Sequence, residues 1–204
     1  MMDDVPAEKG SLFSQKYFEG YKKRVVLKDN GKVTSEFVYE GTYYTYKGTG
    51  NQWARKKLFY VLMSIAYSIS TCLAMSFRTP MNNARWIAFF ETVSIFSILG
   101  IMGCTFLRCM TKRKMTRWEY RMTYISLKEM LFVALVLSVA LTTIFILYPF
   151  AGKTELSVSC VACFFISSLI ALITGVSLRH EKYLQEESND LVNGIDITND
   201  YTDM

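Results

Sequence analysis

Four long apolar stretches constrain the fold of this 204-residue chain more than any other feature of its sequence. Each is 20 to 23 residues long and lacks Asp, Lys, Arg and His, and Glu91 is the one charged residue inside them. A helix of about 20 residues crosses the hydrocarbon core of a bilayer. The sequence therefore predicts a membrane all-α fold. The predicted spans are residues 58–77, 86–107, 130–152 and 156–178.

The connections between these stretches predict how they pair and which way they face. Residues 78–85 and 153–155 allow only tight turns, so we expect a four-helix bundle of two hairpins. The connection 108–129 carries seven Lys and Arg, whereas the two short connections together carry three. Lys and Arg in short loops stay on the cytosolic side. We therefore expect a multi-pass plasma-membrane protein with cytosolic N and C termini, in a bacterial membrane by its short loops.

The N-terminal region, residues 1–57, predicts a small β structure on the cytosolic side. Residues 23–28, 32–39 and 42–47 are rich in β-branched and aromatic side chains and are separated by turn residues. We expect a three-stranded antiparallel β-meander at about 23–47. A three-residue turn at residues 29–31 would place Leu27 opposite Val33 and Val25 opposite Ser35. The acidic tail, residues 179–204, predicts disorder beyond a short continuation of the last helix.

The basic connection has a helical pattern of its own. Four apolar residues, Met115, Trp118, Met122 and Ile125, are spaced by three and four along the sequence. This spacing favours a basic amphipathic helix lying in the headgroup region before the third span. The alternative is charge that only sets orientation, and both interpretations stay open. The basic residues of the predicted surface helix are Lys112, Arg113, Lys114, Arg117 and Arg121.

Small side chains recur at steps of four residues within the spans, which lets membrane helices approach closely. This pattern favours helix packing over a polar path for a substrate. The predicted packing stripes contain Ser64, Ser68, Cys72, Ser76, Ser138, Thr142, Ser159, Cys163, Ser167 and Gly175. Cys160 and Cys163 have CxxC spacing, but inside a span they indicate packing, so we expect no metal site and no cofactor.

Glu91 is a candidate for function because a carboxylate is costly in hydrocarbon. It follows Trp86 by only five residues, so it could reach the headgroups or pair with Arg85 or Arg78. It could instead bind a proton or another cation. Both interpretations stay open.

The sequence contains no nucleophile beside a base, no HExxH and no phosphate-binding glycine loop. We therefore expect a non-enzymatic subunit or scaffold that docks partners through its cytosolic face. Its expected partners are the lipid bilayer, with anionic headgroups, and either a second protein or a second copy of the chain. Nucleic acid is not expected, because the basic connection is tethered to the membrane at both ends. The alternative function is a small oligomeric transporter or channel that uses Glu91.

Overall fold

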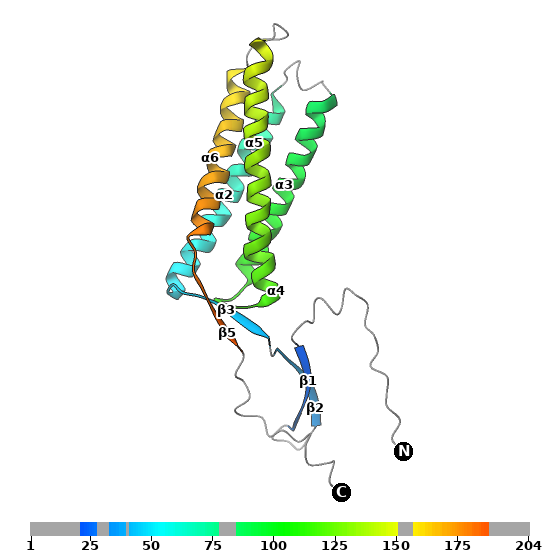
Figure 1. The fold of residues 1–204 in the computed structure, drawn as a ribbon, viewed down its shortest axis with the longest axis vertical. Coiled ribbons are helices and arrows are strands. Elements are labelled where there is room, and N and C mark those ends of the chain that lie inside the picture. The colour runs from blue at the N-terminus through cyan, green and yellow to red at the C-terminus, as the bar shows by residue number, and fades with distance from the viewer. Residues whose placement is uncertain (1–20, 28–32, 40, 78–84, 151–156, 188–204) are drawn as a thin grey trace, which may run out of the picture.

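The computed structural model describes residues 21–27, 33–39, 41–77, 85–150 and 157–187. This part of the chain contains four helices long and apolar enough to cross a membrane. They are α2 (Gly50–Ser76), α3 (Arg85–Met110), α5 (Ser126–Phe150) and α6 (Val158–Arg179). Each contains most of one predicted span, so the prediction of four transmembrane helices is confirmed (Figure 1).

The helices form a closed ring of neighbours. α2 packs against α3 and α6, and α5 packs against the same two helices. The pairs joined by short connections, α2 with α3 and α5 with α6, are thus in contact, as the hairpin prediction requires. We call the end of the bundle at which β3 lies the base, and the opposite end the outer end (Figure 1).

Each helix buries a seam of residues spaced alternately by four and three. On α6 the seam runs through Cys160, Phe164, Ser167, Ala171, Thr174 and Leu178. On α5 it runs through Leu127, Leu131, Ala134, Ser138, Leu141 and Phe145. A mean spacing of 3.5 is that of helices packed at about +20° in a left-handed bundle.

The predicted small-residue stripes follow these seams only in part. A step of four residues turns a helix about 40° past one full turn, so a stripe at steps of four drifts off the contact face. Accordingly Ser64 is buried, Ser68 is half-buried, and Cys72 and Ser76 are exposed. On α6 Ser167 is buried, Cys163 and Gly175 are half-buried and Ser159 is exposed. On α5 both Ser138 and Thr142 are buried.

Side chains fill the described interior at three levels. An outer cluster contains Ala74, Ile87, Leu141, Phe145, Cys160 and Phe164. A middle cluster includes Tyr60, Tyr67, Ile98, Ile101, Leu131 and Ala171. A base cluster contains Tyr46, Trp53 and Met115. Large apolar side chains such as Phe89, Phe96 and Phe132 are instead exposed on the outside of the ring, where lipid would cover them.

The first two predicted strands form an antiparallel hairpin, β1 (Tyr21–Leu27) with β2 (Val33–Tyr39). Leu27 lies opposite Val33 and Val25 opposite Ser35, so the predicted register is confirmed. The turn at residues 29–31 lies outside the described residues.

The third strand corrects the predicted meander. β3 (Thr42–Tyr46) pairs with β4 (Lys114–Thr116) on one side and β5 (Tyr183–Glu187) on the other, giving the sheet order β4-β3-β5. β3 leads within a few residues into α2, so it is held at the base, where the α3–α5 connection and the exit of α6 also lie. These two segments supply hydrogen bonds to both of its edges.

The strand β5 also corrects the prediction that the chain is disordered soon after α6. Pairing with β3 orders residues 183–187, although their composition is polar and acidic. The rest of the predicted disordered tail, residues 188–204, lies outside the described residues.

The basic connection is a strand followed by the start of the third span, and not a separate surface helix. Thr116 caps a helix that runs through α4 (Arg117–Tyr120) and a π-helical turn, η2 (Arg121–Ile125), into α5. The Thr116 hydroxyl accepts a hydrogen bond from the backbone N–H of Glu119, and the Glu119 carboxylate accepts one from the backbone N–H of Thr116. This reciprocal pair is a capping box. Met115 precedes this cap, lies in β4 and is fully buried, whereas Trp118 and Ile125 are exposed and Met122 is half-buried.

Candidate functional site

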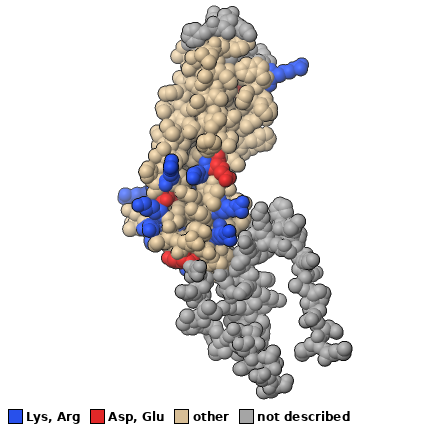
Figure 2. All heavy atoms as spheres, viewed as in Figure 1, with Lys and Arg blue, Asp and Glu red and all other residues tan. Residues whose placement is uncertain are grey.

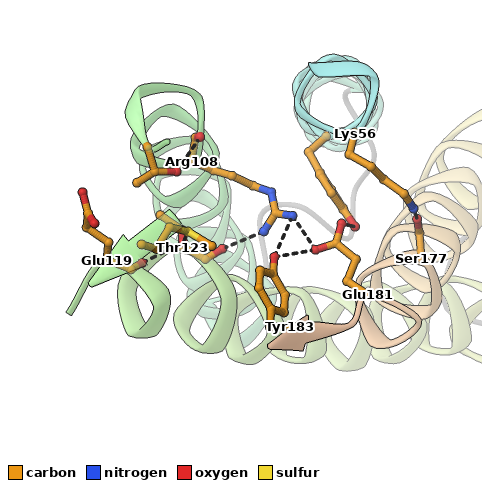
Figure 3. Close-up of polar contacts among 10 residues, drawn as sticks. Lys56, Arg108, Glu119, Thr123, Ser177, Glu181 and Tyr183 are labelled. Carbon is orange, nitrogen blue, oxygen red and sulfur yellow. Dashed lines mark hydrogen bonds and ion pairs between the residues drawn. The ribbon is translucent and has the colours of Figure 1, made fainter. Parts of the chain in front are cut away.

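A fully buried guanidinium lies at the base of the bundle. Arg108 is on the inner seam of α3, two residues before the helix ends, and its exposed fraction is 0%. It forms an ion pair with Glu181, whose side chain is 1% exposed (Figure 3). Because a buried charge is strongly destabilising unless it is paired, this ion pair must form for the base to fold as it does.

The Glu181 carboxylate receives donors from three parts of the chain. Its Oε1 accepts from the Tyr60 hydroxyl of α2 at 2.9 Å. Its Oε2 accepts from Arg108 and from the hydroxyl of Tyr183 in β5, the latter at 2.8 Å. Glu181 follows α6 by two residues, so it connects the end of the last span to α2, α3 and the sheet.

Aromatic rings and a helical carbonyl surround Arg108. Its Cζ lies 4.8 Å from the ring centroid of Trp53 and 4.6 Å from that of Tyr60, both on α2. Such cation–π contacts strengthen where water is excluded. Its Nη1 donates to the carbonyl of Thr123 in the π-helical turn at 3.4 Å. π-helical turns are often found at functional sites. Nε is buried and has no hydrogen-bond partner among the described residues.

The tyrosines at this site stay neutral at physiological pH. Burial raises the pKa of the Tyr183 phenol, and the nearby Glu181 carboxylate raises it further, against the opposing effect of Arg108. Burial and Glu181 also raise the pKa of Tyr46 in β3. The Tyr183 hydroxyl is therefore available as a neutral donor to Glu181.

Two lysines of α2 connect the base to neighbouring helices. Lys57 Nζ donates to the carbonyl of Cys109 at 2.8 Å and to that of Thr111 at 2.5 Å. A cation is favourable beside the carbonyls at a helix C-terminus, which here is the end of α3. Lys56 Nζ donates to the Ser177 hydroxyl of α6 at 2.8 Å (Figure 3).

Charge on the described surface is strongly asymmetric. Exposed Lys and Arg gather around the base (Figure 2). Arg85 is exposed at the start of α3, at the outer end. We call the exposed set at the base the basic rim. It contains Lys47, Arg55, Lys112, Arg113, Lys114, Arg117, Arg121, Lys128, Arg179 and Lys182. Lys114 lies 3.9 Å from Glu186, but both side chains are about half-exposed, so this pair contributes little to stability.

The structure does not bring the predicted ion-site residues together. Glu91 faces the interior, and its Oε1 is buried without a hydrogen-bond partner in the described part of the chain. Among the described residues it makes no ion pair, so the predicted pairing with Arg85 is absent there. Arg78 lies outside the described residues.

Sequence reasoning missed the ion pair at the base. By sequence, Arg108 belongs to the basic connection that predicts orientation, and Glu181 belongs to the acidic tail. The spacing of Ile101, Thr105 and Arg108 continues the inner seam of α3 and would have placed Arg108 inside the bundle. No comparable signal marks Glu181, because its burial depends on how the chain leaves α6.

Together these features define an integral multi-pass membrane protein with four spans and a folded base. Comparison of the chain with protein-family models, curated proteins and solved structures found no match. Within the described residues, no group of three or more His, Cys, Asp or Glu side chains could hold a metal ion.

Proposed function

We propose that this protein is a non-enzymatic membrane subunit or scaffold that docks a partner through the basic rim, on the cytosolic side. The observation that carries the proposal is the buried ion pair of Arg108 with Glu181, because it joins α2, α3, η2 and β5 into one unit beneath the rim. The basic rim is thereby presented on a fixed support.

A fixed support favours docking. A surface that is already ordered loses less conformational entropy when a partner binds than a set of independent loops would lose. The segments that meet at the base lie far apart in the sequence, for example Tyr46 and Tyr183, whose ring centroids are 5.9 Å apart. Their mutual contacts hold the exposed basic residues between them in place.

The charge of the rim indicates the chemistry of its partners. Lys and Arg near a cytosolic membrane surface are attracted to anionic headgroups, at about 1 kcal/mol per residue. Residues that point away from the bilayer would attract an acidic protein surface and speed its association. We infer that headgroups hold the rim against the membrane and that an acidic face of a protein docks on it.

Co-purification of the full chain in mild detergent tests the docking function. The test variant carries Lys112→Glu, Arg121→Glu and Lys182→Glu, three exposed rim residues whose side chains make no hydrogen bond within the described part of the chain. The control is Arg85→Glu at the outer end. We expect a partner to co-purify in stoichiometric amount with the parent chain and with the control variant, and to be absent from the purified triple variant. Purification of the parent chain alone would contradict docking.

A small oligomeric transporter or channel that uses Glu91 is the second candidate. The buried, unpaired Oε1 of Glu91 favours it. Against it, the described interior at this level is filled by the outer cluster. Glu91→Gln should abolish proton-driven flux in proteoliposomes while the protein stays folded and inserted, and unchanged flux would exclude this candidate.

A further inference from the structure

Two charged residues lie on the inner seam of α3. The seam contains Ile87, Glu91, Ser94, Ile98, Ile101, Thr105 and Arg108. Glu91 and Arg108 are 17 residues apart, which separates them by about 25 Å along the helix. They are too far apart to neutralise each other, so each depends on its own surroundings.

Those surroundings differ completely. Arg108 has a carboxylate partner, two aromatic faces and a backbone acceptor. Glu91 has an enclosed Oε1 without a hydrogen-bond partner and without a counter-charge among the described residues. Among the described residues, the interior charge near the base is paired and the one near the outer end is not.

The elements around Glu91 bring no cation to it. Ile87, one turn away on the same seam, belongs to the apolar outer cluster. α6 contributes Cys160, close enough to interact electrostatically. On α5 the nearest titratable group described is Tyr148, whose ring lies 6.1 Å from that of Trp86. The outer half of α2 has two titratable groups. Tyr67 is buried and its hydroxyl makes no hydrogen bond to the described residues, whereas the side chain of Cys72 is exposed on the outside of the ring. Arg85 is exposed at the start of α3.

We propose that Glu91 is held as a neutral carboxylic acid and is a proton-binding site reached from the outer end of the bundle. An ionised carboxylate here would have no counter-charge among the described residues, and its enclosed Oε1 would have no water, which is costly in hydrocarbon. Glu91 is half-buried and lies six residues from the start of α3, about 9 Å of helix rise, so a proton can reach it from the aqueous boundary. This site goes beyond the docking function, and it deepens the transport candidate without requiring it.

Dicyclohexylcarbodiimide, an apolar carbodiimide, tests the protonation state directly. The reagent takes the carboxylic proton onto one nitrogen, the carboxylate oxygen bonds to the central carbon, and the acyl group then migrates to nitrogen as a stable N-acylurea with no leaving group. An ionised carboxylate lacks the proton that starts this reaction. The full chain in lipid vesicles is treated from mildly acidic to mildly alkaline pH, and adducts are located by peptide mass spectrometry.

We expect an adduct at Glu91 at mildly acidic and neutral pH, falling by about tenfold per pH unit once the carboxyl ionises. Glu129, which is exposed near the base, serves as an internal control. A water-soluble carbodiimide, used in a parallel reaction, should modify Glu129 in preference to Glu91. Glu91→Gln should remove the adduct. A Glu91 that stays unmodified by the apolar reagent at every pH would overturn the proposal, as would an adduct that is confined to acidic pH and lost by neutrality.

Thermal unfolding of Glu91→Gln provides a second measurement. The amide is close in shape to the neutral acid, so we expect the Tm in detergent to stay the same or rise. A large fall in Tm would show that the ionised form stabilises the fold and would overturn the proposal. If the carbodiimide labels Glu91 but Glu91→Gln leaves the proton flux unchanged, transport is excluded and the proton site remains. Neither the labelling nor the flux measurement tests the docking function.

Discussion

Arg108 is the residue on which the base of the bundle depends most. Taking a guanidinium and a carboxylate out of water costs several kcal/mol per ion, and their attraction offsets this cost only when further hydrogen bonds satisfy both groups. Glu181 meets this condition with three donors. Arg108 meets it at both terminal nitrogens, whereas Nε makes no hydrogen bond to the described residues.

Removing one member of this ion pair should cost far more than removing both. Arg108→Met leaves the Glu181 carboxylate buried and unpaired, so we expect a loss of about 3–5 kcal/mol in the free energy of unfolding. Arg108→Met combined with Glu181→Met leaves no buried charge, and its Tm in detergent should lie well above that of either single variant. Lys114→Met, which breaks the exposed contact with Glu186, is the matched control and should cost less than about 1 kcal/mol. Equal effects of the single and double variants would show that the pair is not the determinant.

The raised pKa values of Tyr46 and Tyr183 predict loss of stability in alkali. The folded protein holds these phenolic protons more tightly than the unfolded chain, whose tyrosines have a pKa of about 10. The stabilisation is therefore complete below about pH 10 and is lost as pH rises above it. Tyr46→Phe should make the fall in Tm with pH shallower, because its hydroxyl makes no hydrogen bond to the described residues and only its ionisation is removed. A slope unchanged in Tyr46→Phe and in Tyr183→Phe would contradict this cause.

At the scale of elements, hydropathy predicted the membrane helices because each span must be continuously apolar to cross the bilayer. The β1–β2 hairpin was also predictable, since its register depends on a local turn. The pairing of β3 was not predictable, because β4 and β5 are contributed by residues about 70 and 140 positions further along the chain. The point at which the basic connection ends and the helix begins was predictable from Thr116 and Glu119, because Thr followed three residues later by Glu is a helix-capping pattern.

Disulfide trapping tests the corrected strand order. In a chain with its native cysteines replaced, Tyr44→Cys with Gln185→Cys should cross-link, because these residues are opposite each other in β3 and β5. Tyr44→Cys with Phe37→Cys would be opposite in a β1-β2-β3 meander, and we expect no cross-link there. Non-reducing gel mobility of the full chain in membranes reports both pairs. The reverse result would restore the meander.

At the scale of the whole molecule, the structure combines a lipid-facing bundle with a base that carries nearly all of the exposed positive charge described. Positive charge at one end of a bundle is the usual mark of the cytosolic side. The packed interior and the charged base are consistent with the proposed docking function, in which the base is the cytosolic end. Glu91 is the exception, and it lies near the opposite end.

Site-specific photo-crosslinking in intact membranes tests the docking function most directly. A photoreactive residue is placed at Lys112 or Lys182 on the basic rim, at Arg85 on the outer end, or at Phe96 on the lipid-facing side of α3. We expect the two rim positions to form adducts of one defined mass with a second protein, and the other two positions to form none. Adducts between copies of this chain at Phe96, with none at the rim, would contradict docking and favour an oligomeric transporter.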